Sequence, residues 1–123
     1  MRNNAEHREQ SAFFQILALN EKRYPYLKYI FAVANGGNRN IITATMLKAE
    51  GVKRGIWDVC IPFPNGKAHG AFIEFKAGKN KLTPEQIEFG SAVTDAGHST
   101  TVAYDCMSAI DFVEGYFGIT LAT

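Results

Sequence analysis

The sequence predicts an α/β fold in which helices and strands alternate within one domain covering residues 1–123. Three observations lead to this fold class. Apolar residues recur at helical spacing in some segments, they occupy every second position in others, and glycine or proline stands at several boundaries between them. With 123 residues and 46% hydrophobic side chains, the chain can bury a core without disulfides or metals.

The N-terminal half is predicted to contain two helices and one strand. A stripe made by Phe13, Ile16 and Leu17 indicates the first helix. Gly51 favours the left-handed conformation in which many helices end, so it closes the second helix. The predicted elements are a helix from Glu6 to about Asn20, a strand from Tyr29 to Ala34 and a helix from Asn40 to Glu50.

The C-terminal half is predicted to contain three strands and two helices. Asn65-Gly66 is a turn signal between the first two strands. Thr83 and Gln86 have the spacing of a capping box, and Pro84 fits the first helical position. The predicted elements are strands from Trp57 to about Phe63 and from Ala71 to Lys76, a helix from Thr83 to about Ala96, a strand from Thr100 to Tyr104 and a helix from Ser108 to Tyr116.

Two carboxylates and one ammonium group suggest a chemical site, because Glu74 and Lys76 follow Asp58 in a segment that is predicted to be extended. In such a strand Glu74 and Lys76 share one face, while Ile73 and Phe75 point to the other. Carboxylate oxygens suit Mg²⁺ or Mn²⁺, and a lysine can orient water or neutralise charge on a phosphate. The spacing alone fits a solvent-exposed Glu–Lys pair equally well. The surrounding motifs therefore carry the assignment.

Four motifs stand in a characteristic order, and together they resemble the VRR-NUC family, a branch of the PD-(D/E)xK nucleases. The motifs are Asn35-Gly36-Gly37-Asn38-Arg39, Gly51-Val52-Lys53-Arg54-Gly55-Ile56-Trp57-Asp58, Ile73-Glu74-Phe75-Lys76 and Leu82-Thr83-Pro84-Glu85-Gln86. The resemblance extends from about Glu6 to about Tyr116 and is strongest with small stand-alone members of the kind that bacteriophages encode. Trp57 departs from the pattern, since the family usually has proline there. The resemblance implies an αβββαβ core with a central mixed β-sheet flanked by helices.

The resemblance also implies a metal-dependent nuclease that uses Mg²⁺ or Mn²⁺. Its pattern assigns Asp58, Glu74 and the backbone carbonyl of Phe75 as metal ligands. Lys76 would position the attacking water or stabilise the transition state. Hydrolysis would leave 5′-phosphate and 3′-hydroxyl ends.

An acid from the first helix is expected to join these ligands. Both Glu6 and Glu9 lie at helical spacings that can extend the buried stripe toward the sheet. The resemblance favours Glu6, because family members often place Glu four residues before Gln, as Glu6 precedes Gln10 here. The helix dipole alone also favours acids in a first helical turn.

Gln86 has two explanations that can coexist. Its spacing from Thr83 accounts for it as part of a capping box. The resembled family has a glutamine at the matching position, held near the site, which makes Gln86 a candidate catalytic residue as well.

Charge is distributed unevenly along the chain, although the net charge is only +1. All 13 Lys and Arg lie in residues 1–81 together with 6 acids, whereas residues 82–123 hold 6 acids and no Lys or Arg. The basic part contains three of the four motifs, among them the segments with Asp58 and Glu74, so we expect it to face nucleic acid, although folding can also mix the two regions. The candidate DNA-binding residues are Arg39 in the glycine loop and Lys53, Arg54, Lys79 and Lys81 beside the catalytic segments.

The metal site requires a particular register between two strands. A plain two-residue turn at Asn65-Gly66 would place Asp58 opposite Ile73, so that the two carboxylates would lie on opposite faces of the sheet. A one-residue offset brings Asp58 beside Glu74. Pro62 and Pro64 cannot donate ladder hydrogen bonds, so a bulge or a wider loop between Pro62 and Gly70 is expected to supply that offset.

The resemblance implies that the substrate is branched DNA, such as a four-way (Holliday) junction, and that the nuclease acts as a homodimer. The polar N-terminus, the lack of a membrane-length apolar run and two unpaired cysteines favour a soluble cytoplasmic protein without a membrane partner, in the host cytoplasm if a phage encodes it. Two other functions remain open. One is a DNA-binding or assembly module that does not cleave, and the other is a metal-dependent phosphohydrolase with a nucleotide-sized pocket.

Overall fold

A computed structural model describes residues 4–34 and 41–123. Its helices and strands follow the predicted order, with one additional 3₁₀ helix before the first strand. The elements are α1 (Asn4–Asn20), η1 (Pro25–Tyr29), β1 (Phe31–Ala32), α2 (Ile41–Ala49), β2 (Val59–Ile61), β3 (Ala71–Phe75), α3 (Pro84–Asp95), β4 (Ser99–Ala103) and α4 (Cys106–Phe117).

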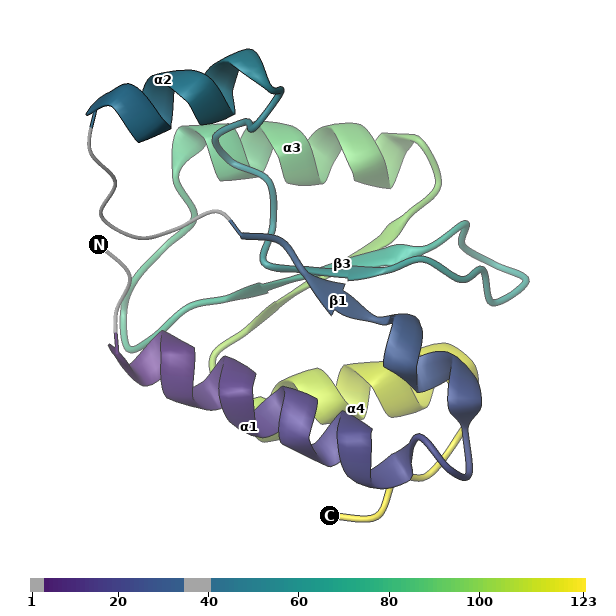
Figure 1. The fold of residues 1–123 in the computed structure, drawn as a ribbon. Coiled ribbons are helices and arrows are strands. Elements are labelled where there is room, and N and C mark those ends of the chain that lie inside the picture. Colours follow the sequence, from purple (N-terminus) through teal and green to yellow (C-terminus); the bar gives the residue numbers. More distant parts are fainter. Residues whose placement is uncertain (1–3, 35–40) are drawn as a thin grey trace.

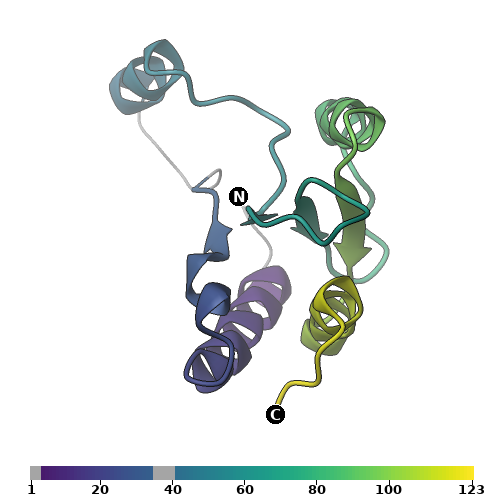
Figure 2. The ribbon, with the colours of Figure 1, turned by 90° about the vertical axis from the view of Figure 1, so that its right-hand side faces the viewer.

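The four strands form a single mixed sheet in the order β1-β2-β3-β4. The β1–β2 and β2–β3 pairs are antiparallel, whereas β3 and β4 run parallel. Helices α1 and α4 lie on one side of the sheet and α2 and α3 lie on the other, as Figures 1 and 2 show from two directions. The predicted α/β fold, with a mixed sheet flanked by helices, is therefore confirmed.

The main core lies between the sheet and the α1–α4 layer. Ile73 and Phe75 of β3 are fully buried there, which follows from their position on alternate sites of the strand. Phe13 of α1 packs against Phe75, with ring centroids 5.6 Å apart. Burying each such side chain contributes about 1.5–3 kcal/mol, so this layer holds most of the hydrophobic stabilisation. Other core residues are Leu17, Leu27, Val59, Ile61, Ala109, Ile110 and Val113.

The opposite face of the sheet is covered more thinly. All of α3 is described, and Gly90 is its one buried residue. Phe89 of α3 packs edge-on against Phe72 of β3, with ring centroids 5.0 Å apart. Because side chains alternate along β3, Glu74 lies on this same face as Phe72. The polar site therefore lies on the less densely packed side of the sheet.

Several element boundaries differ from the prediction. Tyr29 belongs to η1 rather than to the first strand, because Pro25 starts a 3₁₀ turn that consumes this segment. The strand that was predicted from residue 57 to 63 is limited to Val59–Ile61. Helix α4 begins at Cys106 rather than at residue 108, since the Asp105 side chain caps it by accepting a hydrogen bond from the Ser108 N–H at 2.8 Å.

Other boundaries agree closely. Thr83 and Gln86 form the predicted capping box, and Gly51 has a φ of 97°, as expected for the end of α2. The start that was predicted for α2 at Asn40 lies outside the described residues. Within the described residues, no helix is long and apolar enough to cross a membrane.

Candidate active site

The register of β2 and β3 brings Asp58 beside Glu74. The paired residues are Val59 with Ile73, Cys60 with Phe72 and Ile61 with Ala71. Continuing this register by one position places Asp58 opposite Glu74, so both side chains lie on the same face of the sheet. The predicted one-residue offset is confirmed, and the wider loop at 62–70 supplies it.

Two hydrogen bonds tie the carboxylates to the backbone of the neighbouring strand. The Asp58 N–H donates to Glu74 Oε1 at 3.1 Å, and the Phe75 N–H donates to Asp58 Oδ2 at 2.9 Å. Each carboxylate therefore accepts a hydrogen bond from the strand that carries the other one. This reciprocal arrangement fixes the two acids as adjacent neighbours.

The pKa of Glu74 is raised to about 8 by its burial first and by the nearby Asp58 carboxylate second. Only 3% of Glu74 is exposed, so its charged form has lost most of its hydration. The Lys76 ammonium, 3.8 Å from Glu74 Oε2, acts in the opposite direction and lowers the pKa. With this raised pKa, Glu74 keeps its proton near neutral pH in the metal-free protein, and a bound cation would favour the doubly ionised pair.

Gln86 reaches this pair from the first turn of α3. Its Nε2 donates to Glu74 Oε2 at 2.9 Å, while its Oε1 accepts a hydrogen bond from the Thr83 N–H at 2.9 Å. The Gln86 side chain therefore does both things that the sequence suggested. It caps α3, and it lies beside the paired acids. Four residues are thus brought together from the start of β2, the end of β3 and the first turn of α3: Asp58 directly before β2, Glu74 in β3, Lys76 directly after β3, and Gln86 in α3.

The two acids of α1 have different partners. Glu6 Oε2 accepts hydrogen bonds from the Ala77 N–H and from Asn80 Nδ2, both at 3.2 Å. Glu9 Oε1 instead accepts a 2.7 Å hydrogen bond from the N–H of Cys106, at the N-terminus of α4. The Glu6 side chain therefore binds the loop that follows Lys76. The Glu9 side chain instead accepts a hydrogen bond from an N–H in the first turn of α4.

Oxygen donors dominate the environment of the paired acids. Asp58 and Glu74 place carboxylate oxygens side by side, and oxygen is the ligand atom that Mg²⁺ and Mn²⁺ prefer. In the described ranges 4–34 and 41–123, no three His, Cys, Asp or Glu side chains form a metal-binding group. The predicted addition of Glu6 to a three-acid cluster is therefore not observed.

The candidate DNA-binding residues lie on loops that adjoin the site. Lys53 and Arg54 are exposed in the segment that leads to Asp58, and Lys79 and Lys81 are exposed on either side of Asn80. Asn80 itself is bound to Glu6. Arg39 and its glycine loop lie outside the described residues.

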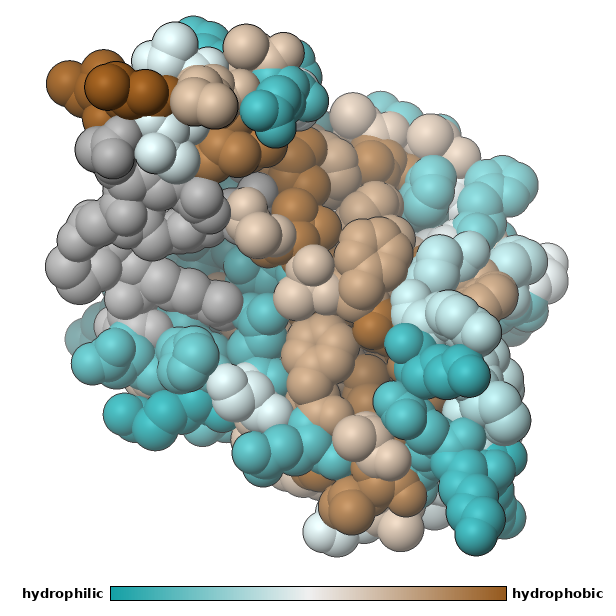
Figure 3. All heavy atoms as spheres, in the orientation of Figure 1, coloured by the Kyte–Doolittle hydropathy of each residue, from teal (hydrophilic) through white to brown (hydrophobic). Residues whose placement is uncertain are grey.

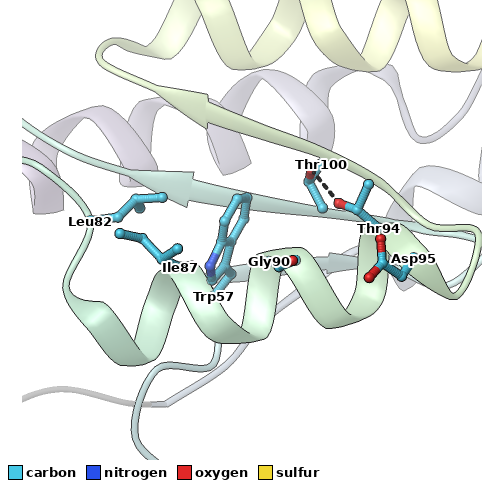
Figure 4. Close-up of a pocket in the computed structure, with 8 residues that line it drawn as sticks. Trp57, Leu82, Ile87, Gly90, Thr94, Asp95 and Thr100 are labelled. Carbon is cyan, nitrogen blue, oxygen red and sulfur yellow. Dashed lines mark hydrogen bonds between the residues drawn. The ribbon is translucent and has the colours of Figure 1, made fainter.

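An open groove of about 300 Å³ lies beside the site, between α3 and the sheet (Figure 4). Its described lining residues are Trp57, Leu82, Ile87, Gly90, Ser91, Thr94, Asp95 and Thr100. None of these described residues is Lys or Arg, and Asp95 is an acid, so no cationic side chain among them faces the groove. The paired acids are also not among its lining residues.

Sequence reasoning missed two residues that organise the site. Trp57 is buried and donates a 2.9 Å hydrogen bond from Nε1 to the Gln86 carbonyl, and Asn80 binds Glu6. In the sequence, Trp57 stands out only because the resembled pattern usually has proline at this position. A buried tryptophan requires a partner for its N–H, which was the one available signal. Asn80 gave no signal that distinguishes it from an ordinary loop residue.

Comparison with known proteins shows that the fold is similar to that of solved structures. A solved structure described as a "VRR_NUC domain protein" superposes with a TM-score of 0.76, at 23% sequence identity, over 97% of this chain and 93% of the other. No family model and no curated protein matches the sequence. At this identity the similarity establishes the fold. The chain therefore has the α/β fold of that VRR_NUC domain protein.

Proposed function

We propose that this protein is a metal-dependent nuclease of the VRR-NUC type, within the PD-(D/E)xK superfamily, that hydrolyses phosphodiester bonds in DNA. One observation carries the proposal. Asp58 and Glu74 lie side by side on antiparallel strands, with Lys76 on the same face as Glu74 and its Nζ 3.8 Å from Glu74 Oε2. The similarity of the whole fold to a VRR_NUC domain protein supports it.

The donor set fits a hard divalent cation. Asp58, Glu74 and the Phe75 carbonyl would hold Mg²⁺ or Mn²⁺, because all three offer oxygen and a bound cation would favour the ionised form of the buried Glu74. When bound, such a cation supplies Lewis-acid polarisation of the scissile phosphate and lowers the pKa of the attacking water. Glu6 would add negative charge from α1 and hold the loop after Lys76 through the Ala77 N–H.

Lys76 and Gln86 have separate tasks in this proposal. The Lys76 ammonium would orient the attacking water and offset the charge that builds up on the phosphate in the transition state. Gln86 is already bound to Glu74, so it would keep that carboxylate in a single orientation. A fixed ligand costs little reorganisation when the reaction occurs.

DNA would be bound through its backbone rather than through its bases. Arg39, Lys53, Arg54, Lys79 and Lys81 are proposed to contact phosphates beside the paired acids. Phosphate contacts position a nucleic acid without reading its sequence, which suits an enzyme that recognises the shape of branched DNA such as a four-way junction.

A homodimer is proposed as the active form, and the exposed apolar surface supports it. Helix α2 has no buried residue, and Ile41 and Ile42 are 84% and 73% exposed. Met46 of α2 and Phe31 of the edge strand β1 are also largely exposed. Figure 3 shows apolar side chains on α2 and in a band down the middle of the same face. An apolar surface of this kind is typical of a protein–protein interface.

The decisive experiment is a cleavage assay on single-stranded, duplex, flapped and four-way-junction DNA with Mg²⁺, Mn²⁺ or EDTA. We expect cleavage of the branched substrates with either metal and none in EDTA. Glu74→Gln, purified in the same way, excludes a contaminating nuclease, and Glu88→Gln on the exposed face of α3 is the matched control. Binding of all four DNAs without cleavage would instead favour a DNA-binding module.

A further inference from the structure

We propose that Trp57 is a positioning residue that holds the first turn of α3 against β2 and thereby keeps the Gln86 amide on Glu74. The expected effect of Trp57 on catalysis rests on the proposed nuclease function. The hydrogen bonds and the packing of Trp57 are independent of that function.

The capping box fixes Gln86 only with respect to its own helix. Thr83 N–H donates to Gln86 Oε1 at 2.9 Å, and the Gln86 N–H donates to Thr83 Oγ1 at 3.2 Å. With Oε1 held in this way, Nε2 is the other end of the amide, and it reaches Glu74 Oε2 at 2.9 Å. This last bond crosses from α3 to β3, so it also depends on where the helix lies on the sheet.

Trp57 supplies that second constraint. Its Nε1 donates to the Gln86 carbonyl at 2.9 Å, and its ring lies against Gly90, one helical turn later. A Cβ atom at Gly90 would be 2.6 Å from Trp57 Cζ2, so only glycine leaves room for the indole. Gly90 is the one buried residue of α3, and the three atoms nearest to that Cβ position all belong to Trp57. Figure 4 shows the indole between the sheet and this helix.

A neighbouring contact strengthens the same attachment. A Cβ atom at Gly55 would be 2.6 Å from the backbone carbonyl carbon of Glu85, in the first turn of α3. The segment from Gly55 to Trp57 therefore touches the start of α3 at two points, and Asp58 follows directly. The position of Asp58 on β2 and the position of Gln86 on α3 are set by the same attachment.

Geometry explains why a small displacement would matter. Moving α3 by about 1 Å would stretch the Gln86–Glu74 contact beyond the range of a hydrogen bond. A buried carboxylate that loses such a donor is free to reorient, and a misplacement of this size can reduce a rate by up to about 100-fold. Trp57 is thus expected to influence the rate without contacting the substrate.

The test compares Trp57→Phe, which removes the indole N–H, with Phe89→Leu, which weakens the packing of α3 on Phe72 but keeps the Trp57 hydrogen bond and the Gly90 contact. The direct measurement is the side-chain amide resonance of Gln86 in ¹⁵N-labelled protein without DNA or metal. In Trp57→Phe it should move toward the position of a solvent-exposed glutamine. In Phe89→Leu it should stay close to its wild-type position. Gly90→Ala, which pushes the indole away, is a second variant that should act like Trp57→Phe.

A kinetic measurement separates positioning from general loss of stability. The single-turnover cleavage rate of Trp57→Phe at saturating DNA and Mg²⁺ should fall about 10-fold, as expected when one hydrogen bond is removed, while the Kd for DNA stays unchanged. Phe89→Leu should lower the unfolding midpoint and keep the rate. An unchanged Gln86 resonance in both Trp57→Phe and Gly90→Ala would overturn the inference. If the wild-type protein did not cleave DNA, the proposed function would fail, and the resonance would still decide the role of Trp57.

Discussion

Asp58 and Glu74 accept hydrogen bonds from each other's strand, at 2.9 Å from the Phe75 N–H and 3.1 Å from the Asp58 N–H respectively. This reciprocal pairing makes the two acids one unit rather than two independent ligands. It follows from the offset register of β2 and β3, because any odd shift would turn one carboxylate to the other face of the sheet.

The first prediction concerns the chemistry of this unit. Glu74→Ala and Lys76→Ala should each reduce cleavage by at least about 1,000-fold, because a metal ligand or the transition-state cation is removed. DNA binding should change little, since it depends on many phosphate contacts. Single-turnover rates and a fluorescence-anisotropy titration measure the two effects. Cleavage near the wild-type rate in either variant, with an unchanged fold, would remove that residue from the site.

The raised pKa of Glu74 leads to a second prediction, on stability. The unfolded chain releases this proton near pH 4.5, whereas the folded, metal-free protein keeps it until about pH 8. Between these values the folded state binds more protons, so the free energy of unfolding should fall as pH rises, by up to about 1.4 kcal/mol per pH unit. Above the folded pKa the decrease should level off.

Glu74→Gln cannot ionise, so it should remove this contribution to the slope. Urea unfolding in EDTA, repeated from pH 5 to pH 8.5, measures it in both proteins. Mg²⁺ should restore the stability of the wild-type protein at the alkaline end, because a ligand that binds the folded state stabilises it. The same slope in the variant and in the wild type would show that Glu74 titrates normally.

A third prediction separates the two acids of α1. Glu9→Ala should destabilise the fold by about 1–2 kcal/mol, because the Cys106 N–H at the start of α4 loses its acceptor, and it should leave the cleavage rate unchanged. Glu6→Ala should have a similar effect on stability and should also slow cleavage, since it releases Ala77 and Asn80 next to Lys76. Chemical denaturation and initial rates test the pair. Equal cleavage rates in the two variants would exclude a role for Glu6 in the site.

The sequence predicted the order of elements and the offset register, because both depend on local signals. Pro62 and Pro64 show where the ladder ends, and alternation along β3 shows which side chains share a face. Helical spacing did not distinguish Glu6 from Glu9, and only the resemblance favoured Glu6. These residues are three positions apart and therefore lie on nearly the same side of a helix, so only the placement of α1 on the sheet distinguishes their partners.

The contact of Trp57 with α3 was likewise invisible in the sequence. Its partners, Gln86 and Gly90, are far away along the chain, and neither belongs to a repeated pattern with it. Gly90 appears in the sequence as an unfavourable residue inside a helix, at a cost of about 1 kcal/mol relative to alanine. The structure explains this glycine, because the Trp57 indole occupies the space that a side chain at position 90 would need.

The last prediction concerns the uneven distribution of charge. Replacing Lys53, Arg54, Lys79 and Lys81 by glutamine should weaken DNA binding, and it should make log Kd less dependent on log salt concentration, by up to about 0.9 for each phosphate that is no longer neutralised. All four side chains are exposed, so the fold should tolerate the change.

A matched control is available in Lys22, Arg23, Lys28 and Lys67, which carry the same total charge and are also exposed. They belong to the α1–η1 region and to the 62–70 loop, and that loop leaves β2 at the end opposite to Asp58. Replacing them changes the net charge by the same amount, so long-range attraction falls similarly in both variants. Only the removal of side chains that touch phosphates should flatten the salt dependence. If both sets of replacements reduced the slope equally, net charge rather than a DNA-binding surface around the paired acids would account for binding.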